Sequence, residues 1–128
     1  MATVLIVDDE LPLRSILAMM VREAGHTAVL AGDGRQAVEL VRQQRPDLVL
    51  SDVMMPRLDG VVLCRGLKMA ADTASIPVIL MSAGTNTPWH GARADAFLAK
   101  PFDIEEVEAL LERWLPVDVP ATTTSERK

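Results

Sequence analysis

The chain has 128 residues, 49% of them hydrophobic and 24% charged, which suits a single folded domain and excludes a disordered chain. Its net charge of −5 argues against a direct nucleic-acid surface, because phosphate backbones attract clustered Lys and Arg. Cys64 is the one cysteine, no signal peptide follows Met1, and no apolar run reaches about 20 residues. Together these observations predict a cytoplasmic protein without membrane contact.

The first half of the chain alternates apolar runs with segments of helical period. A strand is predicted at Thr3–Val7, and the following apolar residues recur at helical spacing up to Gly25, where a helix stop is expected. A second strand is predicted at Thr27–Ala31, and a second helix at Gly34–Gln44 before Pro46. The strand runs are continuous, which is typical of parallel strands covered on both faces.

The second half repeats this alternation. It is predicted to hold a strand at Asp47–Ser51, a helix at Leu58–Ala71, strands at Ile76–Met81 and Ala96–Ala99, and a last helix at Ile104–Trp114. Asp103 is the expected N-cap of that last helix. Alternating strands and helices predict an α/β fold, a doubly wound five-stranded parallel sheet with helices on both faces.

Two segments depart from the alternation. Between Ser82 and Phe97 there is little room for a helix, and Pro88 and Gly91 are poor residues in a helix interior, so the fourth helix is expected to be short or irregular. From Pro116 onward the helical period stops. We therefore expect one domain over residues 1–115 and a flexible tail or linker over residues 116–128.

Polar residues interrupt or follow the apolar runs at their carboxyl ends. Asp8 and Asp9 follow the first run, Asp52 the third, Ser82 the fourth and Lys100 the fifth. The carboxyl ends of parallel strands meet at one edge of a sheet, where ligands of open α/β folds bind. Converging carboxylates repel one another unless a cation joins them, and oxygen ligands with an incomplete shell suit Mg²⁺. The lysine and the hydroxyl add positive charge and a donor for a phosphoryl group.

In this order the motifs resemble the receiver domain of two-component response regulators, from about Thr3 to Trp114. The matching pieces are Val7-Asp8-Asp9-Glu10, the run Asp52-Val53-Met54-Met55-Pro56-Arg57-Leu58-Asp59-Gly60, Met81-Ser82-Ala83 and Lys100-Pro101-Phe102. The resemblance implies a flavodoxin-like sheet in the order 2-1-3-4-5.

The resemblance also implies roles for individual residues. Asp52 would accept the phosphoryl group, and the Ser82 hydroxyl and Lys100 ammonium would each hold a phosphoryl oxygen. Ser82 and Phe97 would form the conformational switch, although Phe97 by itself reads more readily as a packing residue. Pro101 matches a cis-proline position of the family.

For the cofactor, the resemblance implies one Mg²⁺ ion. Asp9 and Asp52 would bind it directly, Asp8 mainly through a water molecule, and the backbone carbonyl of Met54 would be the third protein ligand. The implied partners are a sensor histidine kinase or a phosphotransfer protein upstream, and a protein partner or output domain downstream. The domain would catalyse only its own phosphorylation and a slow dephosphorylation.

Two other functions fit parts of the sequence. A Mg²⁺-dependent phosphatase with an aspartate nucleophile is disfavoured, because the second aspartate of such enzymes is replaced by Met54 and no cap domain is present. A pseudo-receiver that binds partners without phosphorylation is favoured only by the irregular stretch between Ser82 and Phe97. A phosphorylation assay with a small phosphodonor distinguishes the three functions.

Overall fold

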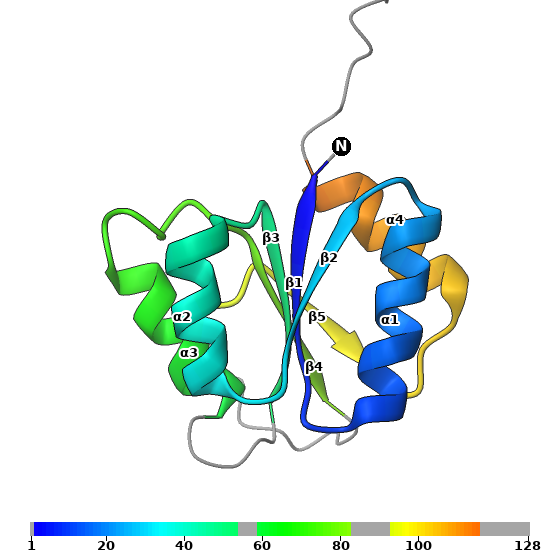
Figure 1. The fold of residues 1–128 in the computed structure, drawn as a ribbon, viewed down its shortest axis with the longest axis horizontal. Coiled ribbons are helices and arrows are strands. Elements are labelled where there is room, and N and C mark those ends of the chain that lie inside the picture. Colours follow the sequence, from blue (N-terminus) through cyan, green and yellow to red (C-terminus); the bar gives the residue numbers. More distant parts are fainter. Residues whose placement is uncertain (1, 54–58, 83–92, 116–128) are drawn as a thin grey trace, which may run out of the picture.

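The structure, a computed structural model, describes residues 2–53, 59–82 and 93–115. These residues form a parallel sheet between two layers of helices (Figure 1). The strands are β1 (Thr3–Val7), β2 (Thr27–Ala31), β3 (Leu48–Asp52), β4 (Val78–Ser82) and β5 (Ala96–Ala99), and the helices are α1 (Leu11–Glu23), α2 (Gly34–Gln44), α3 (Gly60–Met69) and α4 (Ile104–Trp114). The strand order is β2-β1-β3-β4-β5, so the predicted doubly wound topology is confirmed.

Most predicted element boundaries agree with the structure. The first, second and fifth strands, the second helix and the last helix have the predicted ends. β3 begins at Leu48 and ends at Asp52, one residue later at each end than predicted, and β4 begins at Val78 rather than Ile76 and ends at Ser82 rather than Met81. The described part of the third helix, α3, runs from Gly60 to Met69 rather than over the predicted Leu58–Ala71. The expected short fourth helix and the expected tail fall on residues 83–92 and 116–128, outside the described residues.

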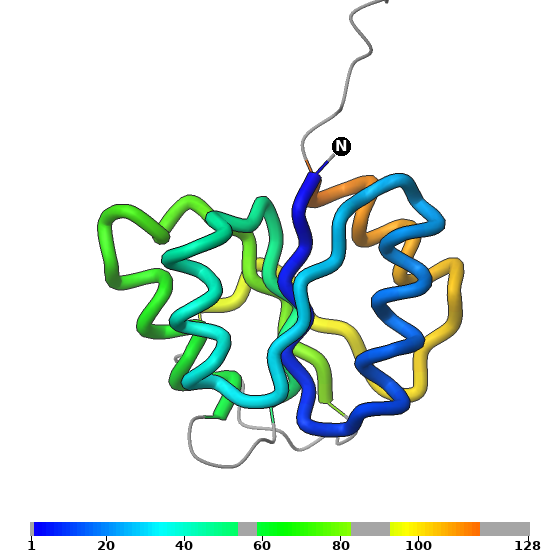
Figure 2. The backbone as a smooth tube through the Cα atoms, in the orientation of Figure 1, coloured from blue at the N-terminus to red at the C-terminus, as the bar shows by residue number. Residues whose placement is uncertain are grey.

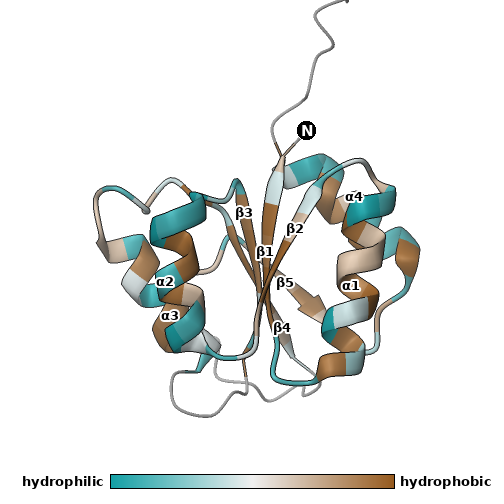
Figure 3. Ribbon diagram, viewed as in Figure 1, coloured by the Kyte–Doolittle hydropathy of each residue, from teal (hydrophilic) through white to brown (hydrophobic). Residues whose placement is uncertain are grey.

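The sheet has a separate apolar core on each face. On one face, Leu50 and Ile79 of the strands pack with Leu17 of α1 and Leu111 of α4. On the other face, strand residues pack against α2 and α3. The tube view shows α1 with α4 on one side of the strands and α2 with α3 on the other (Figure 2), and the strands are hydrophobic along most of their length (Figure 3). Burial on both faces explains why the strand sequences are continuous apolar runs.

Aspartate residues are the N-caps of three of the helices. The carboxylates of Asp33, Asp59 and Asp103 each accept a hydrogen bond from a backbone N–H in the first turn of α2, α3 and α4. At α4 the Glu106 side chain also accepts from the Asp103 N–H, which completes a capping box and confirms the predicted cap. Gly25, the predicted stop after the first helix, has a φ of +93°.

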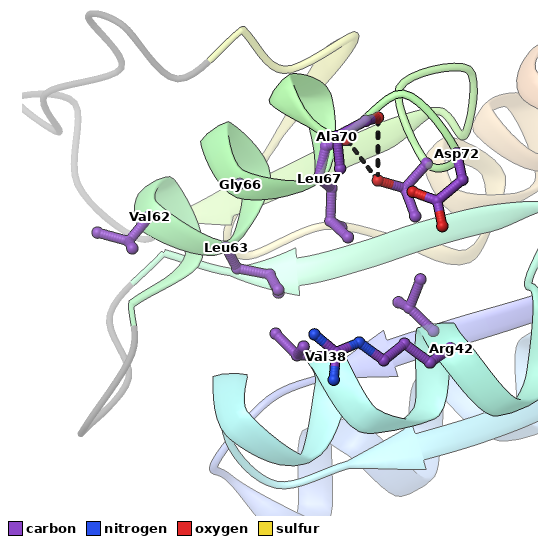
Figure 4. A pocket seen from close by; sticks show the side chains of 10 residues that line it. Val38, Arg42, Val62, Leu63, Gly66, Leu67, Ala70 and Asp72 are labelled. Atoms are coloured by element: carbon purple, nitrogen blue, oxygen red, sulfur yellow. Dashed lines mark hydrogen bonds between the residues drawn. The ribbon is translucent and has the colours of Figure 1, made fainter.

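A pocket of about 420 Å³ lies between α2 and α3 (Figure 4). Val38 and Leu63 contribute to its apolar wall, and Gly66 leaves the α3 side open, since a Cβ atom there would have no neighbour within 4 Å. At one end Thr73 donates through Oγ1 to the Leu67 carbonyl at 2.6 Å, which holds the loop after α3 against the helix.

None of the helices in the described ranges has both the length and the apolar character needed to span a bilayer.

Candidate functional site

The five polar residues singled out at the strand ends lie along one edge of the sheet, at the bottom of Figure 1. Asp8 and Asp9 directly follow β1, Asp52 ends β3, Ser82 ends β4 and Lys100 directly follows β5. Because β1 pairs with β3, β3 with β4 and β4 with β5, these ends are neighbours in space. The predicted convergence at the carboxyl edge is therefore confirmed.

Three carboxylates meet at the centre of this edge. One oxygen of each of Asp8, Asp9 and Asp52 lies within 4.8 Å of the others, the one such potential metal-binding group among the described residues. Asp8 is 0% exposed and Asp52 is 5% exposed, whereas Asp9 faces solvent. The cluster combines a buried floor with an open side, from which a ligand in solution can approach.

Lys100 provides a positive charge beside the cluster. Its Nζ lies 3.3 Å from Asp52 Oδ1 and 3.4 Å from Asp8 Oδ2, and 3.8 Å from the exposed Glu10 carboxylate. Burial lowers the pKa of Lys100, but the Asp52 and Asp8 carboxylates raise it by more, so that it lies above the ordinary 10.5. The ammonium is therefore held in its charged form at neutral pH and offsets part of the repulsion between the carboxylates.

The position of Asp8 is fixed by two further contacts. Its Oδ1 accepts a hydrogen bond from the Glu10 N–H at 2.9 Å, and its carbonyl accepts one from Arg14 Nη1 at 2.8 Å. Arg14 stands on the first turns of α1, six residues after Asp8. Its role was not predicted, because nothing in the sequence distinguishes it from a surface arginine.

The end of β3 is packed against the start of α3. The Gly60 N–H donates to the Val53 carbonyl at 3.0 Å, and Ser51 Oγ donates to the Asp52 carbonyl at 3.0 Å. A Cβ atom on Gly60 would overlap the Asp52 carbonyl oxygen and lie 2.9 Å from its carbonyl carbon. A residue without a side chain is therefore required at the first position of α3 if Asp52 is to keep its place.

The residues predicted to form a switch lie on β4 and β5. Ser82 is buried, and its carbonyl accepts the Lys100 N–H at 2.9 Å. Phe97 is 46% exposed, so its side chain is only about half covered and does not belong to the buried core. The peptide bond between Lys100 and Pro101 is cis, as the resemblance implied. Met54 lies outside the described residues.

The donor set fits a hard divalent cation. It consists of carboxylate oxygens from Asp8, Asp9 and Asp52, and no thiol or imidazole belongs to this group among the described residues. Oxygen ligands that leave room for water are the preference of Mg²⁺. The arrangement combines a cluster of carboxylates that could hold a cation, a nearly buried carboxylate at Asp52 and an ammonium group, a combination that suits phosphoryl transfer.

Comparison with known proteins agrees with this chemistry. The model of the response regulator receiver domain family matches residues 4–112. The response regulator MprA of Mycolicibacterium vanbaalenii is 39% identical over 123 residues, which cover 90% of this chain and 52% of that protein. MprA of Mycobacterium leprae is 38% identical, with 90% and 53% covered. The chain thus spans about half the length of the curated relatives it matches.

Solved structures give the same result. One similar structure is the receiver domain of the sensor histidine kinase PA1611 from Pseudomonas aeruginosa, which is described with a magnesium ion coordinated in its active site cleft. Its sequence is 30% identical and its TM-score is 0.83, and the match covers 88% of this chain and 96% of that one. The chemotaxis protein CheY4 of Vibrio cholerae is 29% identical with a TM-score of 0.83, covering 90% and 99%. On this agreement of sequence, topology and site, the chain belongs to the response regulator receiver domain family.

Proposed function

We propose that the chain is a phosphorylation-controlled switch in which Asp52 accepts a phosphoryl group from a phosphohistidine. The observation that carries the proposal is the position of Asp52, nearly buried between two other carboxylates and 3.3 Å from the Lys100 ammonium. A buried carboxylate with a cation on one side and a metal-type cluster on the other is poised to act as a nucleophile toward phosphorus.

In the proposed transfer, an oxygen of Asp52 attacks the phosphorus atom in line with the P–N bond of the donor. That bond breaks, its electron pair stays on the imidazole nitrogen, which takes a proton from solvent, and an acyl phosphate forms on Asp52. Lys100 exchanges its contact with the Asp52 carboxylate for one with a phosphoryl oxygen. The Ser82 hydroxyl, at the end of the neighbouring strand, donates to another phosphoryl oxygen.

Asp8, Asp9 and Asp52 would hold a Mg²⁺ ion, with the backbone carbonyl of Met54 as a further ligand. When bound, the ion would neutralise charge on the phosphoryl oxygens as the donor bond breaks. Asp9 would bind directly, because it is the solvent-facing carboxylate of the cluster. Asp8 would bind mainly through water, because one of its oxygens accepts the Glu10 N–H and the other contacts Lys100.

The proposed phosphodonor is a sensor histidine kinase or a phosphotransfer protein. Exposed apolar side chains lie near the acidic cluster, on the first turns of α1 (Leu11 and Ile16) and at the start of α4 (Ile104). Between them a pocket of about 400 Å³ is lined by Leu13, Lys100, Pro101 and Phe102. This surface would receive the helix that carries the donor histidine.

After phosphorylation, the domain is proposed to signal by a change of conformation and not to turn over a separate substrate. Ser82 and Phe97 would couple phosphorylation to a change on the surface of β5, where Phe97 is exposed in the described state. The receiver would comprise residues 1–115, with residues 116–128 as a tail or linker to an output domain, since the matched relatives are about twice as long. The proposed compartment is the cytoplasm, where kinases have access to ATP.

The test is labelling with phosphoramidate or acetyl phosphate and Mg²⁺, read by intact mass spectrometry. The wild-type chain should gain one phosphoryl group, and Asp52→Asn should gain none. Asp72→Asn, an exposed aspartate beyond the end of α3, is the matched control and should label like wild type. Equal labelling of Asp52→Asn would refute the assignment of the acceptor, and continuous release of phosphate would indicate a phosphatase.

A further inference from the structure

Strand β5 carries Phe97 and leads into Lys100, yet little in its own sequence fixes its position. It has four residues, lies at the edge of the described sheet and pairs with β4 alone. Only Leu98 is buried. Register is specified by a buried hydrophobic pattern, and a slip of one residue turns every side chain to the other face. A strand with one buried residue needs another device to hold its register.

Asp95, the residue before β5, is bound to the first residue of β4 by two hydrogen bonds. Its N–H donates to the Val78 carbonyl at 2.9 Å, and its carboxylate Oδ2 accepts the Val78 N–H at 2.8 Å. The side chain therefore extends the β4–β5 ladder by one more pairing, at the end opposite the phosphoryl site.

Lys68, near the end of α3, holds that carboxylate in place. Its Nζ lies 2.7 Å from Asp95 Oδ2 and donates to the carbonyls of Ile76 at 2.7 Å and Ala74 at 3.2 Å. Three acceptors match the three N–H groups of an ammonium. The Lys68 side chain is 11% exposed and that of Asp95 28% exposed, so the pair is partly shielded from water. One cation thus joins α3, the loop before β4 and the start of β5.

We propose that Lys68 and Asp95 are positioning residues that set the register of β5 and thereby place Lys100 beside Asp52. The inference rests on the proposed function, in which Lys100 holds a phosphoryl oxygen. From Asp95 to Lys100 the chain advances by five residue steps in an extended conformation, about 16 Å at the rise of a strand. Neither positioning residue touches the acidic cluster, so the pair acts on phosphorylation only through the placement of β5.

The test compares Lys68→Met and Asp95→Asn with Thr73→Val, a control at the same end of α3. Thr73→Val removes the buried hydrogen bond to the Leu67 carbonyl but leaves the Lys68–Asp95 pair untouched. Asp95→Asn keeps an acceptor for the Val78 N–H and loses only the charge, so it provides a milder variant if Lys68→Met folds poorly. Each variant is measured under conditions where urea titration shows that it is folded.

Two readouts are made on each variant. One is the phosphorylation rate with phosphoramidate at saturating Mg²⁺, and the other is hydrogen exchange of the Lys100 amide relative to the Ile6 amide in β1. Lys68→Met should lower the rate about tenfold, as other losses of supporting contacts do, and speed Lys100 exchange relative to Ile6 by a similar factor. Asp95→Asn should show smaller changes of the same sign, and Thr73→Val should stay within about twofold of wild type.

An unchanged phosphorylation rate in folded Lys68→Met would overturn the inference, and so would a Thr73→Val effect of equal size, because general destabilisation would then be sufficient. A different result, labelling that persists in Asp52→Asn, would refute the proposed function. In that case the Lys100 exchange ratio still decides whether the pair holds the register of β5.

Discussion

Two glycines on α3 are expected to respond in opposite ways to the same substitution. Gly60 begins the helix against the end of β3, and Gly66 lies on its open side, next to the pocket between α2 and α3. Alanine adds one methyl group at either position. At Gly66 that methyl group meets nothing within 4 Å, whereas at Gly60 it overlaps the Asp52 carbonyl oxygen and lies 3.0 Å from the Val53 Cα.

The two magnitudes follow from these surroundings. Gly66→Ala gains the difference in helix propensity without a steric cost, about 0.5–1 kcal/mol, which raises the Tm of a domain of this size by about 2–4 °C. Gly60→Ala forces α3 away from β3 against backbone atoms that cannot rotate aside. Overpacking of this kind costs about 1–3 kcal/mol, or about 4–12 °C in Tm.

Thermal unfolding followed by circular dichroism, together with urea titration, measures both effects. Because Gly60 supports the Asp52 backbone, Gly60→Ala should also slow labelling by phosphoramidate at a temperature where it is folded. Gly66→Ala should label like wild type. A Gly60→Ala variant as stable as wild type would show that α3 moves away from β3 freely, and the packing argument for Asp52 would then be wrong.

Three other perturbations test the site and the core. Asp9→Ala should weaken Mg²⁺ binding severely and Asp8→Ala less, as judged by titration, and the reverse order would mean that their roles are exchanged. In receivers the side chain two residues after the acceptor often orients the water that hydrolyses the phosphoaspartate, and Met54 cannot hydrogen-bond that water. The phosphoryl group should therefore be lost slowly from the wild-type chain and faster from Met54→Asn. A wild-type half-life of seconds would contradict this. Burial raises the pKa of Cys64 from 9.0 to about 11. Its thiol should therefore resist iodoacetamide at pH 8 in the folded protein, and the free energy of unfolding should fall between pH 9 and 11 by an amount absent from Cys64→Ala.

The sheet and its carboxyl-edge site were predictable because local patterns determine them. Continuous apolar runs located the strands, and Asp103 marked the start of α4. The one-residue errors at Asp52 and Ser82 have a common cause. A polar residue is read as the end of a strand in the sequence, but its backbone still pairs with the neighbouring strand.

Contacts between distant residues were not predictable. Lys68 and Asp95 are 27 residues apart in the sequence, and in its own segment each looks like an ordinary charged surface residue. The close approach of Gly60 to Asp52 likewise depends on how α3 docks on β3. The half-exposed position of Phe97 could not be read from its sequence either, because it depends on what covers that face of β5.

The direction of α4 has a practical consequence for engineered fusions. The helix runs antiparallel to the strands, so Leu115 lies with Pro46 and Pro77 at the amino edge of the sheet, and the N-terminus is at the same edge in Figure 1. The acidic cluster is at the opposite edge, a full strand length away. A fluorescent protein or affinity tag joined directly at Ala2 or Leu115 would lie at the edge opposite Asp52 and leave the approach to that residue open. A reporter placed there would detect phosphorylation only through changes transmitted across the domain, and not by contact with the phosphoryl group.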